Sequence, residues 1–255
     1  MMTSHLLLPR CLFLAGLAIH FAIGASAASA QDSLQPPDPL TALAVESRPR
    51  QADFRQEPAS PDARELADQV VSSSDNANLP FIVIDKAQAR VYVFDATGQL
   101  RGANSALLGT AVGDDSVPGI GQRKLSTIRP HERTTPAGRF VAYLDRDIHG
   151  EEVMWVDYET SLSLHRIITT NPKEHRAARL ASASPRDKRI TYGCINVAVA
   201  FYEGVVSPLF QRTQGIVYIL PETRPARVVF NSLAVDKRLP MEASAASPQA
   251  NAAPR

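Results

Sequence analysis

One short segment of the sequence combines residue types that favour covalent chemistry: residues 191–196, TYGCIN. Cys194 precedes an expected helix, which Asn196 would cap and along which Val197, Phe201 and Val205 supply an apolar face. A helix N-terminus presents free N–H groups and a partial positive charge, and both favour a thiolate. Gly193 permits a close backbone approach, and the N–H groups of Gly193 and Cys194 would stabilise an oxyanion as the thiolate attacks a carbonyl. The alternative is an inert buried thiol.

A cysteine nucleophile needs a base, and two histidines are candidates for that role. His165 lies in an alternating apolar segment, residues 162–168, which predicts a strand able to hold the imidazole rigidly. Its alternative is an ordinary core or edge histidine. His175 lies in the polar stretch 171–179, which is typical of a solvated surface. His131 and His149 stand in turn-like sequence, and we expect both at the surface.

The composition excludes several functional classes. The chain has 255 residues, 27 Lys+Arg against 26 Asp+Glu, 44% hydrophobic residues and two cysteines. The length suits one or two domains, and the near-zero net charge gives no reason to expect a nucleic-acid partner. Two cysteines exclude a disulfide-dense scaffold and a multi-cysteine zinc site. No H-E-x-x-H motif occurs, so we expect no protein metal site.

Residues 1–30 read as a secretory signal peptide. Arg10 is followed by an uncharged run from Cys11 to Ala30 that ends in an A-x-A cleavage pattern. We therefore expect an exported protein of the periplasm or cell wall, with no stable membrane insertion after cleavage; the alternative is an uncleaved anchor. Cleavage would also remove Cys11, leaving Cys194 to react, to stay inert or to link two chains. The oligomeric state stays open.

The remaining chain divides into three parts. Residues 31–78 are rich in proline and charge and predict an extended, mobile linker, with a short helix over 63–72 capped by Asp62. Residues 79–233 hold many short strand patterns and predict a mainly β domain. Residues 234–255, rich in Ala and Pro, predict a disordered tail. The strands are expected at 81–85, 89–94, 100–108, 139–144, 153–158, 162–168 and 216–220.

Three stretches together resemble the L,D-transpeptidase catalytic domain, also called the YkuD-type domain. Residues 191–196 resemble its [S/T]-H-G-C-apolar-[R/N] signature, and Thr135–Phe140, TPAGRF, resembles its T-P-x-G-x-F stretch. Phe81–Phe94 resembles its opening hairpin, and the likeness covers about residues 79–231. The resemblance implies a mainly β, sandwich- or barrel-like fold with a short helix after the catalytic cysteine.

The sequence departs from the family pattern in two places. Tyr192 stands where the family usually has His, and its hydroxyl would position substrate unless the ring serves only packing. His165 precedes Cys194 by 29 positions, whereas His175, at 19, is closer to the family's usual spacing. The strand context nevertheless favours His165, which makes residues 169–188 a loop insertion.

The resemblance implies acyl transfer on peptidoglycan stem peptides without a cofactor. Cys194 would form a thioester and release D-Ala, His165 would carry the proton, and an amine of another stem would accept the acyl group. Thr191, Tyr192 and Asn196 are expected at the substrate site. Arg186 and Arg189 would bind a stem carboxylate unless they form an ordinary solvated charge cluster. Two alternatives stay open: a peptidase or amidase that uses water as acceptor, and a non-catalytic wall-binding relative.

Overall fold

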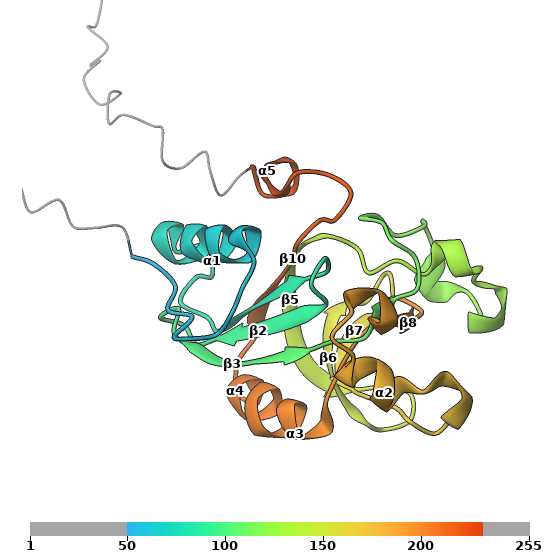
Figure 1. The fold of residues 1–255 in the computed structure, drawn as a ribbon. Helices are drawn as coiled ribbons and strands as arrows, with labels where there is room; N and C mark the ends of the chain where they lie inside the picture. Colours follow the sequence, from blue (N-terminus) through green and yellow to red (C-terminus); the bar gives the residue numbers. More distant parts are fainter. Residues whose placement is uncertain (1–49, 232–255) are drawn as a thin grey trace, which may run out of the picture. The chain divides into compact units, whose positions relative to one another are not determined.

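The computed structural model describes residues 50–231 (Figure 1). The expected signal peptide at 1–30, the first part of the expected linker and the expected tail at 234–255 lie outside the described residues. An eight-stranded sheet dominates, in the order β3-β2-β1-β10-β5-β6-β7-β9, and β4 and β8 form a second, small sheet. The predicted mainly β class is confirmed. The strands are β1 Phe81–Asp85, β2 Arg90–Phe94, β3 Leu100–Ser105, β4 Leu108–Gly109, β5 Gly138–Arg146, β6 Glu152–Asp157, β7 Leu162–Arg166, β8 Arg189–Thr191, β9 Ile195–Val197 and β10 Gly215–Ile219.

The large sheet nearly closes on itself. Leu107, just after β3, exchanges two backbone hydrogen bonds with Asn196 of β9, at 2.8 and 2.9 Å. The first and last strands in the sheet order are thereby joined. Most neighbouring strands are antiparallel, but β1 pairs with β10 in parallel and β7 pairs with β9 in parallel. The parallel pairing of β7 with β9 has the greatest chemical consequence, because these strands carry or adjoin His165 and Cys194.

The sheet is buried on both faces at β1, and successive side chains there enter two different cores. Ile82 and Ile84 enter a core that also contains the helical segment after β9, made of α3 Val199–Phe201, a π-helical stretch Tyr202–Val206 and α4 Ser207–Phe210. Phe81 and Val83 enter a core under α1 Pro61–Ser73. Figure 1 shows α1 and the α3–α4 segment on opposite sides of β2 and β3. The strand scaffold is therefore held from two sides.

Helix α1 makes residues 50–78 part of the folded unit, where the sequence predicted a mobile linker. The helix expected over 63–72 is present, but its N-cap is Ser60, not Asp62, because the Ser60 hydroxyl accepts from the Ala63 N–H at 3.1 Å. Leu66 and Val70 are buried against the sheet. The high proline and charge content led to the linker prediction. The apolar stripe at 66, 70 and 71 indicates a helix, but it does not show which surface the helix packs against.

The helix expected to begin at Asn196 begins later. Residues 195–197 form β9, and α3 starts at Val199. Asn196 cannot act as a cap because its backbone pairs with Leu107 and its side chain is held by Arg176 and His165. The helical segment also continues past the expected end at Ser207, since Pro208 sits in the first turn of α4, where a missing N–H costs little. None of the helices described between residues 50 and 231 could span a membrane.

We predict that Leu66→Ala lowers the free energy of unfolding by about 2–4 kcal/mol, because it leaves a cavity between α1 and the sheet. Glu65→Ala, on the exposed side of the same helix, is the matched control and should change it by less than about 0.5 kcal/mol. Urea denaturation monitored by circular dichroism measures both. Equal effects of the two substitutions would mean that α1 does not pack on the domain.

Candidate active site

The turn that carries Cys194 is closed by its own side chains. It lies between β8 and β9, and the Thr191 hydroxyl accepts from the Gly193 N–H at 3.1 Å and donates to the Cys194 carbonyl at 2.7 Å. Gly193 has a φ of +137°, and a Cβ on it would lie 2.8 Å from the Thr134 carbonyl oxygen. Only glycine fits this position without strain. Thr191 is buried and shapes the turn, so the structure does not place it where a substrate would bind.

The peptide group between Gly193 and Cys194 is held in one orientation by Thr135. The Thr135 hydroxyl donates to the Gly193 carbonyl at 2.7 Å and accepts from the Gly109 N–H at 2.9 Å. In a trans peptide the Cys194 N–H points opposite to that carbonyl. No hydrogen bond among residues 50–231 uses the Cys194 N–H, whereas the Gly193 N–H is occupied by Thr191. Of the two expected oxyanion donors, only Cys194 is therefore available.

A buried ion group, made of Lys86, Asp114, Glu222 and Arg189, binds the backbone carbonyl of Thr135 through Lys86. Lys86, which is fully buried, donates to the carbonyls of Thr135 at 2.9 Å and Gly113 at 2.6 Å and to the Asp114 carboxylate at 2.8 Å. Burial raises the pKa of Asp114, but the hydrogen bonds from Lys86 and from the 222–223 backbone outweigh it, so that pKa lies well below its usual range. Burial lowers the pKa of Lys86. These bonds fix the loops on either side of Thr135.

The register of β7 and β9 brings the imidazole beside the thiol. His165 lies opposite Asn196 in the parallel pair, and alternate residues of a strand face the same side. Ser163 and His165 of β7 therefore share a face with Cys194 and Asn196. The Ser163 hydroxyl lies 3.5 Å from Cys194 Sγ. His165 Nδ1 is 2.8 Å from the Arg166 carbonyl, and Nε2 is 2.9 Å from Asn196 Nδ2.

The thiol and the imidazole shift each other's titration. Burial raises the pKa of Cys194, but the neighbouring His165 prevails and brings that pKa below its usual value. Burial lowers the pKa of His165, but the neighbouring Cys194 prevails and brings it above its usual value. Both ring nitrogens also have other partners, and Sγ contacts the Ser161 carbonyl at 3.6 Å. The thiol and the imidazole are thus coupled neighbours, and each favours the charged form of the other.

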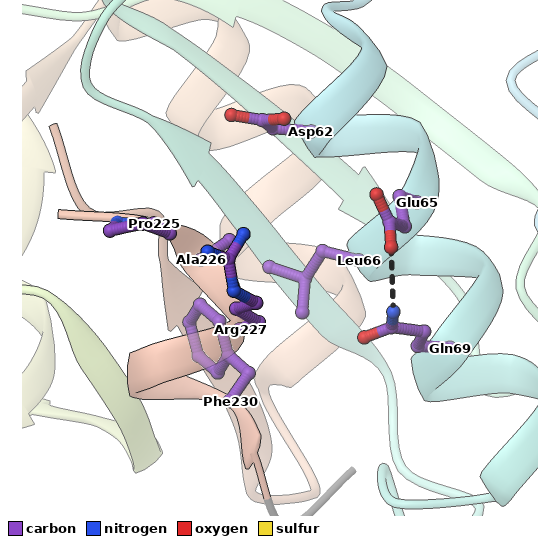
Figure 2. Close-up of a pocket in the computed structure, with 8 residues that line it drawn as sticks. All are labelled: Asp62, Glu65, Leu66, Gln69, Pro225, Ala226, Arg227 and Phe230. Atoms are coloured by element: carbon purple, nitrogen blue, oxygen red, sulfur yellow. Dashed lines mark hydrogen bonds between the residues drawn. The ribbon is translucent and has the colours of Figure 1, made fainter. Parts of the chain in front are cut away.

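Cys194 opens into a cleft of about 370 Å³. One wall is apolar, with Trp155, Leu162 and Ile120, and Tyr192 and Gly193 line it beside the thiol. A second cavity, of about 290 Å³, lies between α1 and α5 Ala226–Val229 and differs in chemistry. Figure 2 shows that its α1 side presents carboxylates and an amide, with Glu65 bound to Gln69, and no nucleophile with a base. The Cys194 cleft is therefore the candidate active site.

Tyr192, which occupies the family's histidine position, has a definite partner. The Arg133 guanidinium carbon lies 3.8 Å from the centre of its ring, a close cation–π contact. Arg133 also donates to the Ile128 carbonyl at 2.9 Å. The aromatic ring is thereby fixed at the mouth of the thiol site, and it lines the cleft.

Of the residues considered for the site, His175 lies at the surface, as expected, and Arg189, Arg186 and Asn196 do not line the cleft. His175 is exposed at the start of α2 Arg176–Ala181, in a left-handed conformation with φ of 49°, and makes no contact with Cys194. Arg189 is paired with Glu222 and donates to the Lys86 carbonyl at 3.0 Å, so it belongs to the buried ion group and cannot bind a substrate carboxylate. Arg186 is exposed and does not line the cleft. Asn196 contacts His165 rather than the cleft.

Three residues that were not expected from the sequence lie at or near the site. Ser163 precedes His165 by two positions in an alternating strand, so the pattern could have placed it on the same face. Trp155 lines the cleft from β6. Arg176 comes from the 169–188 insertion and bonds Asn196. The sequence around Arg176 does not predict this contact, because the contact with Asn196 depends on the three-dimensional path of the insertion.

Comparisons with known proteins give a likeness in structure only. No family model and no curated protein matches the chain. Among solved structures, it matches an L,D-transpeptidase (residues 123–326) from Xylanimonas cellulosilytica at 14% identity, over 55% of this chain and 60% of that one, with a TM-score of 0.36. It also matches the helical cell shape determining protein Pgp2 from Campylobacter jejuni at 13% identity, over 62% and 54%, with a TM-score of 0.37. The catalytic domain of an E. faecium L,D-transpeptidase matches at 14% identity, over 55% and 96%, with a TM-score of 0.32.

The family that the motifs resemble is thus the one to which these solved L,D-transpeptidase structures belong. The match spans less than two thirds of the first two of those chains. At these identities and TM-scores the likeness carries no functional argument, so a function for this protein has to rest on its own residues.

We predict that His165→Ala raises the midpoint pH of Cys194 alkylation by at least about one unit. The substitution removes the neighbour that lowers the thiol pKa and leaves much of the burial that raises it. The measurement is the rate of iodoacetamide alkylation against pH in a Cys11→Ser chain. His175→Ala is the control and should leave the midpoint unchanged. A shift in the control alone would exclude His165 as the thiol's neighbour in solution.

We also predict that Gly193→Ala destabilises the protein by about 1–3 kcal/mol, because the new Cβ meets the Thr134 carbonyl in a left-handed backbone conformation. Gly204→Ala is the matched control, since a Cβ there meets no atom within 4 Å. Thermal unfolding of both variants measures the difference. A Gly193→Ala protein as stable as the control would show that the turn adopts another conformation.

Proposed function

We propose that this protein is a cysteine L,D-transpeptidase that acts on peptidoglycan stem peptides through a thioester. The supporting observation is the half-buried thiol of Cys194, whose pKa is lowered by the strand-held His165 and which opens into a cleft. The motifs around Cys194 and Thr135 support this family among cysteine enzymes. The proposal includes export to the periplasm or cell wall, where the substrate lies.

The first half-reaction forms the acyl-enzyme. Cys194 Sγ attacks the carbonyl carbon of an L-centre that is followed by D-Ala, and His165 Nε2 takes the thiol proton. The Cys194 N–H donates to the oxyanion of the tetrahedral intermediate. The C–N bond then breaks, His165 gives its proton to the departing amine, and D-Ala leaves as a free amino acid.

The second half-reaction transfers the acyl group. A primary amine of another stem attacks the thioester carbonyl, and the neutral imidazole takes a proton from that amine. The C–S bond breaks, and His165 returns the proton to the thiolate. Atoms balance without a cofactor: one peptide bond is broken and another is made. Water in place of the amine would give hydrolysis instead, with a free carboxylate as product.

The replacement of the family's histidine by Tyr192 does not remove the base from this scheme. Among the described residues, His165 is the imidazole beside Cys194, and it lies on a strand rather than in the turn. Tyr192 has no imidazole and therefore does not duplicate the role given to His165. Held by Arg133, it offers a fixed ring and a hydroxyl to the substrate.

We predict that the protein, incubated with a purified disaccharide-tetrapeptide, yields cross-linked dimers that have lost one D-Ala, detected by mass spectrometry. Cys194→Ala should abolish the product, and His165→Ala should reduce its rate by about 100-fold or more, because general acid–base catalysis is lost. His175→Ala should retain it. Trimmed tripeptide alone would identify a hydrolase, and an unchanged substrate would contradict the enzymatic proposal.

A further inference from the structure

The segment that lengthens the spacing between His165 and Cys194 reaches back to the candidate site. Its helix α2 begins at Arg176, whose Nη1 donates to Asn196 Oδ1 at 2.8 Å. The Arg176 Nε is paired with Glu174 in the same segment. The Arg176 side chain is only 14% exposed, so these contacts form in a largely dry environment. A guanidinium from the insertion therefore contacts the residue that touches His165.

These contacts determine which atoms of Asn196 face which neighbour. A guanidinium has only donors, so the amide oxygen must face Arg176. The amide nitrogen then faces His165 Nε2, at 2.9 Å. Because that nitrogen donates, Nε2 must carry a lone pair and the ring proton must sit on Nδ1, where the Arg166 carbonyl accepts it at 2.8 Å. The Arg166 carbonyl by itself already places the ring proton on Nδ1, and the Asn196 amide, oriented by Arg176, is compatible with that tautomer.

The same arrangement opposes protonation of Nε2. An imidazolium would turn an N–H toward the Asn196 NH₂ group, so that two donors would face each other. Rotating the amide relieves this contact but turns the NH₂ group toward Arg176, which creates the same conflict there. Arg176 cannot adapt, because it has no acceptor to offer. Without Arg176, the amide could rotate and its oxygen could accept from the imidazolium.

We propose that Arg176 is a positioning residue, which acts through Asn196 to oppose protonation of His165 Nε2 and so keeps His165 a neutral base. The inference rests on the proposed function only in treating His165 as the base. It explains how a coupled thiol and imidazole can be kept from forming a permanent ion pair, so that the proton moves when the thiol attacks.

The charged and titratable groups around His165 are few. Cys194 lies beside it at the turn before β9, and Arg176 approaches from α2 with Glu174 behind it. Arg166, its neighbour in β7, presents its carbonyl to the ring, while its guanidinium lies over Tyr202 and pairs with Glu203 at 3.1 Å. The positive charge of Arg176 also lowers the pKa of His165.

The test compares three substitutions in the full chain carrying Cys11→Ser. Arg176→Met removes the donor, Arg176→Lys retains one, and Lys173→Met removes an exposed positive charge from the same segment. The rate of iodoacetamide alkylation against pH reports the thiolate, and long-range ¹H–¹⁵N spectra report the His165 tautomer, assigned with His165→Ala. Thermal unfolding checks that each variant is folded.

We expect Arg176→Met to move the alkylation midpoint down by about one pH unit, because the thiolate–imidazolium pair then forms more readily. The alkylation midpoint of Arg176→Lys should lie close to that of the parent, and the midpoint of Lys173→Met should equal it. The parent spectrum should show the proton of neutral His165 on Nδ1, and Arg176→Met should show a larger fraction of doubly protonated imidazolium at the same pH.

Three results would overturn the inference: superimposed profiles for Arg176→Met and the parent, an equal shift in Lys173→Met, or a parent with the ring proton on Nε2. If Arg176→Met fails to fold, Arg176→Gln takes its place: glutamine offers an acceptor as well as donors, so its alkylation midpoint should also lie below that of the parent. These readouts do not depend on acyl transfer. A parent that shows the expected tautomer but leaves the disaccharide-tetrapeptide unchanged would refute the proposed function and not the role of Arg176.

Discussion

The candidate site depends on one constrained peptide bond, that between Gly193 and Cys194. Its carbonyl is held by the Thr135 hydroxyl, and the Thr135 carbonyl is held in turn by Lys86. Burying an ammonium is costly, and Asp114 offsets that cost with a direct hydrogen bond. The result is a chain of contacts that runs from a buried ion pair to the reactive turn. It leaves the Cys194 N–H without a hydrogen-bond partner among residues 50–231, so that this N–H is available for the oxyanion of the proposed reaction.

A second constraint is the parallel pairing of β7 and β9. Strands that run in parallel cannot be joined by a tight turn and need a long crossover connection. Residues 167–194 supply it here, which explains why His165 is far from Cys194 in sequence and adjacent to it in space. The length of that crossover is free to vary, and spacing alone is therefore a poor guide to the base. In this chain the extra length carries Arg176 to the back of the site.

The sequence predicted the individual strands, because each strand depends on the pattern of apolar residues within it. The strand setting of His165 was predicted from alternation, which records the buried face of a strand, although β7 ends at Arg166 and not at 168. The strand at 81–85 was predicted from an apolar run, which fits a strand that is buried on both faces. Contacts between distant segments were not predictable in this way. Arg189 was expected to face substrate because it lies just before the cysteine motif. Its true partner, Glu222, lies far along the chain, and no local pattern reveals this pair. Asn196 was expected to cap a helix because asparagine is a favoured N-cap residue. Its backbone pairing with Leu107 involves a distant segment and leaves no local signal.

Tyr192 shows why a departure from a family pattern has to be interpreted together with its surroundings. A histidine at that position could exchange protons, whereas a tyrosine presents a larger ring that a guanidinium can stack on, and Arg133 does so at 3.8 Å. Tyr192 therefore presents a fixed aromatic ring, stacked on the Arg133 guanidinium, where a histidine would present a titratable imidazole. Proton transfer then falls to one imidazole, which makes the control of that imidazole by Asn196 more consequential.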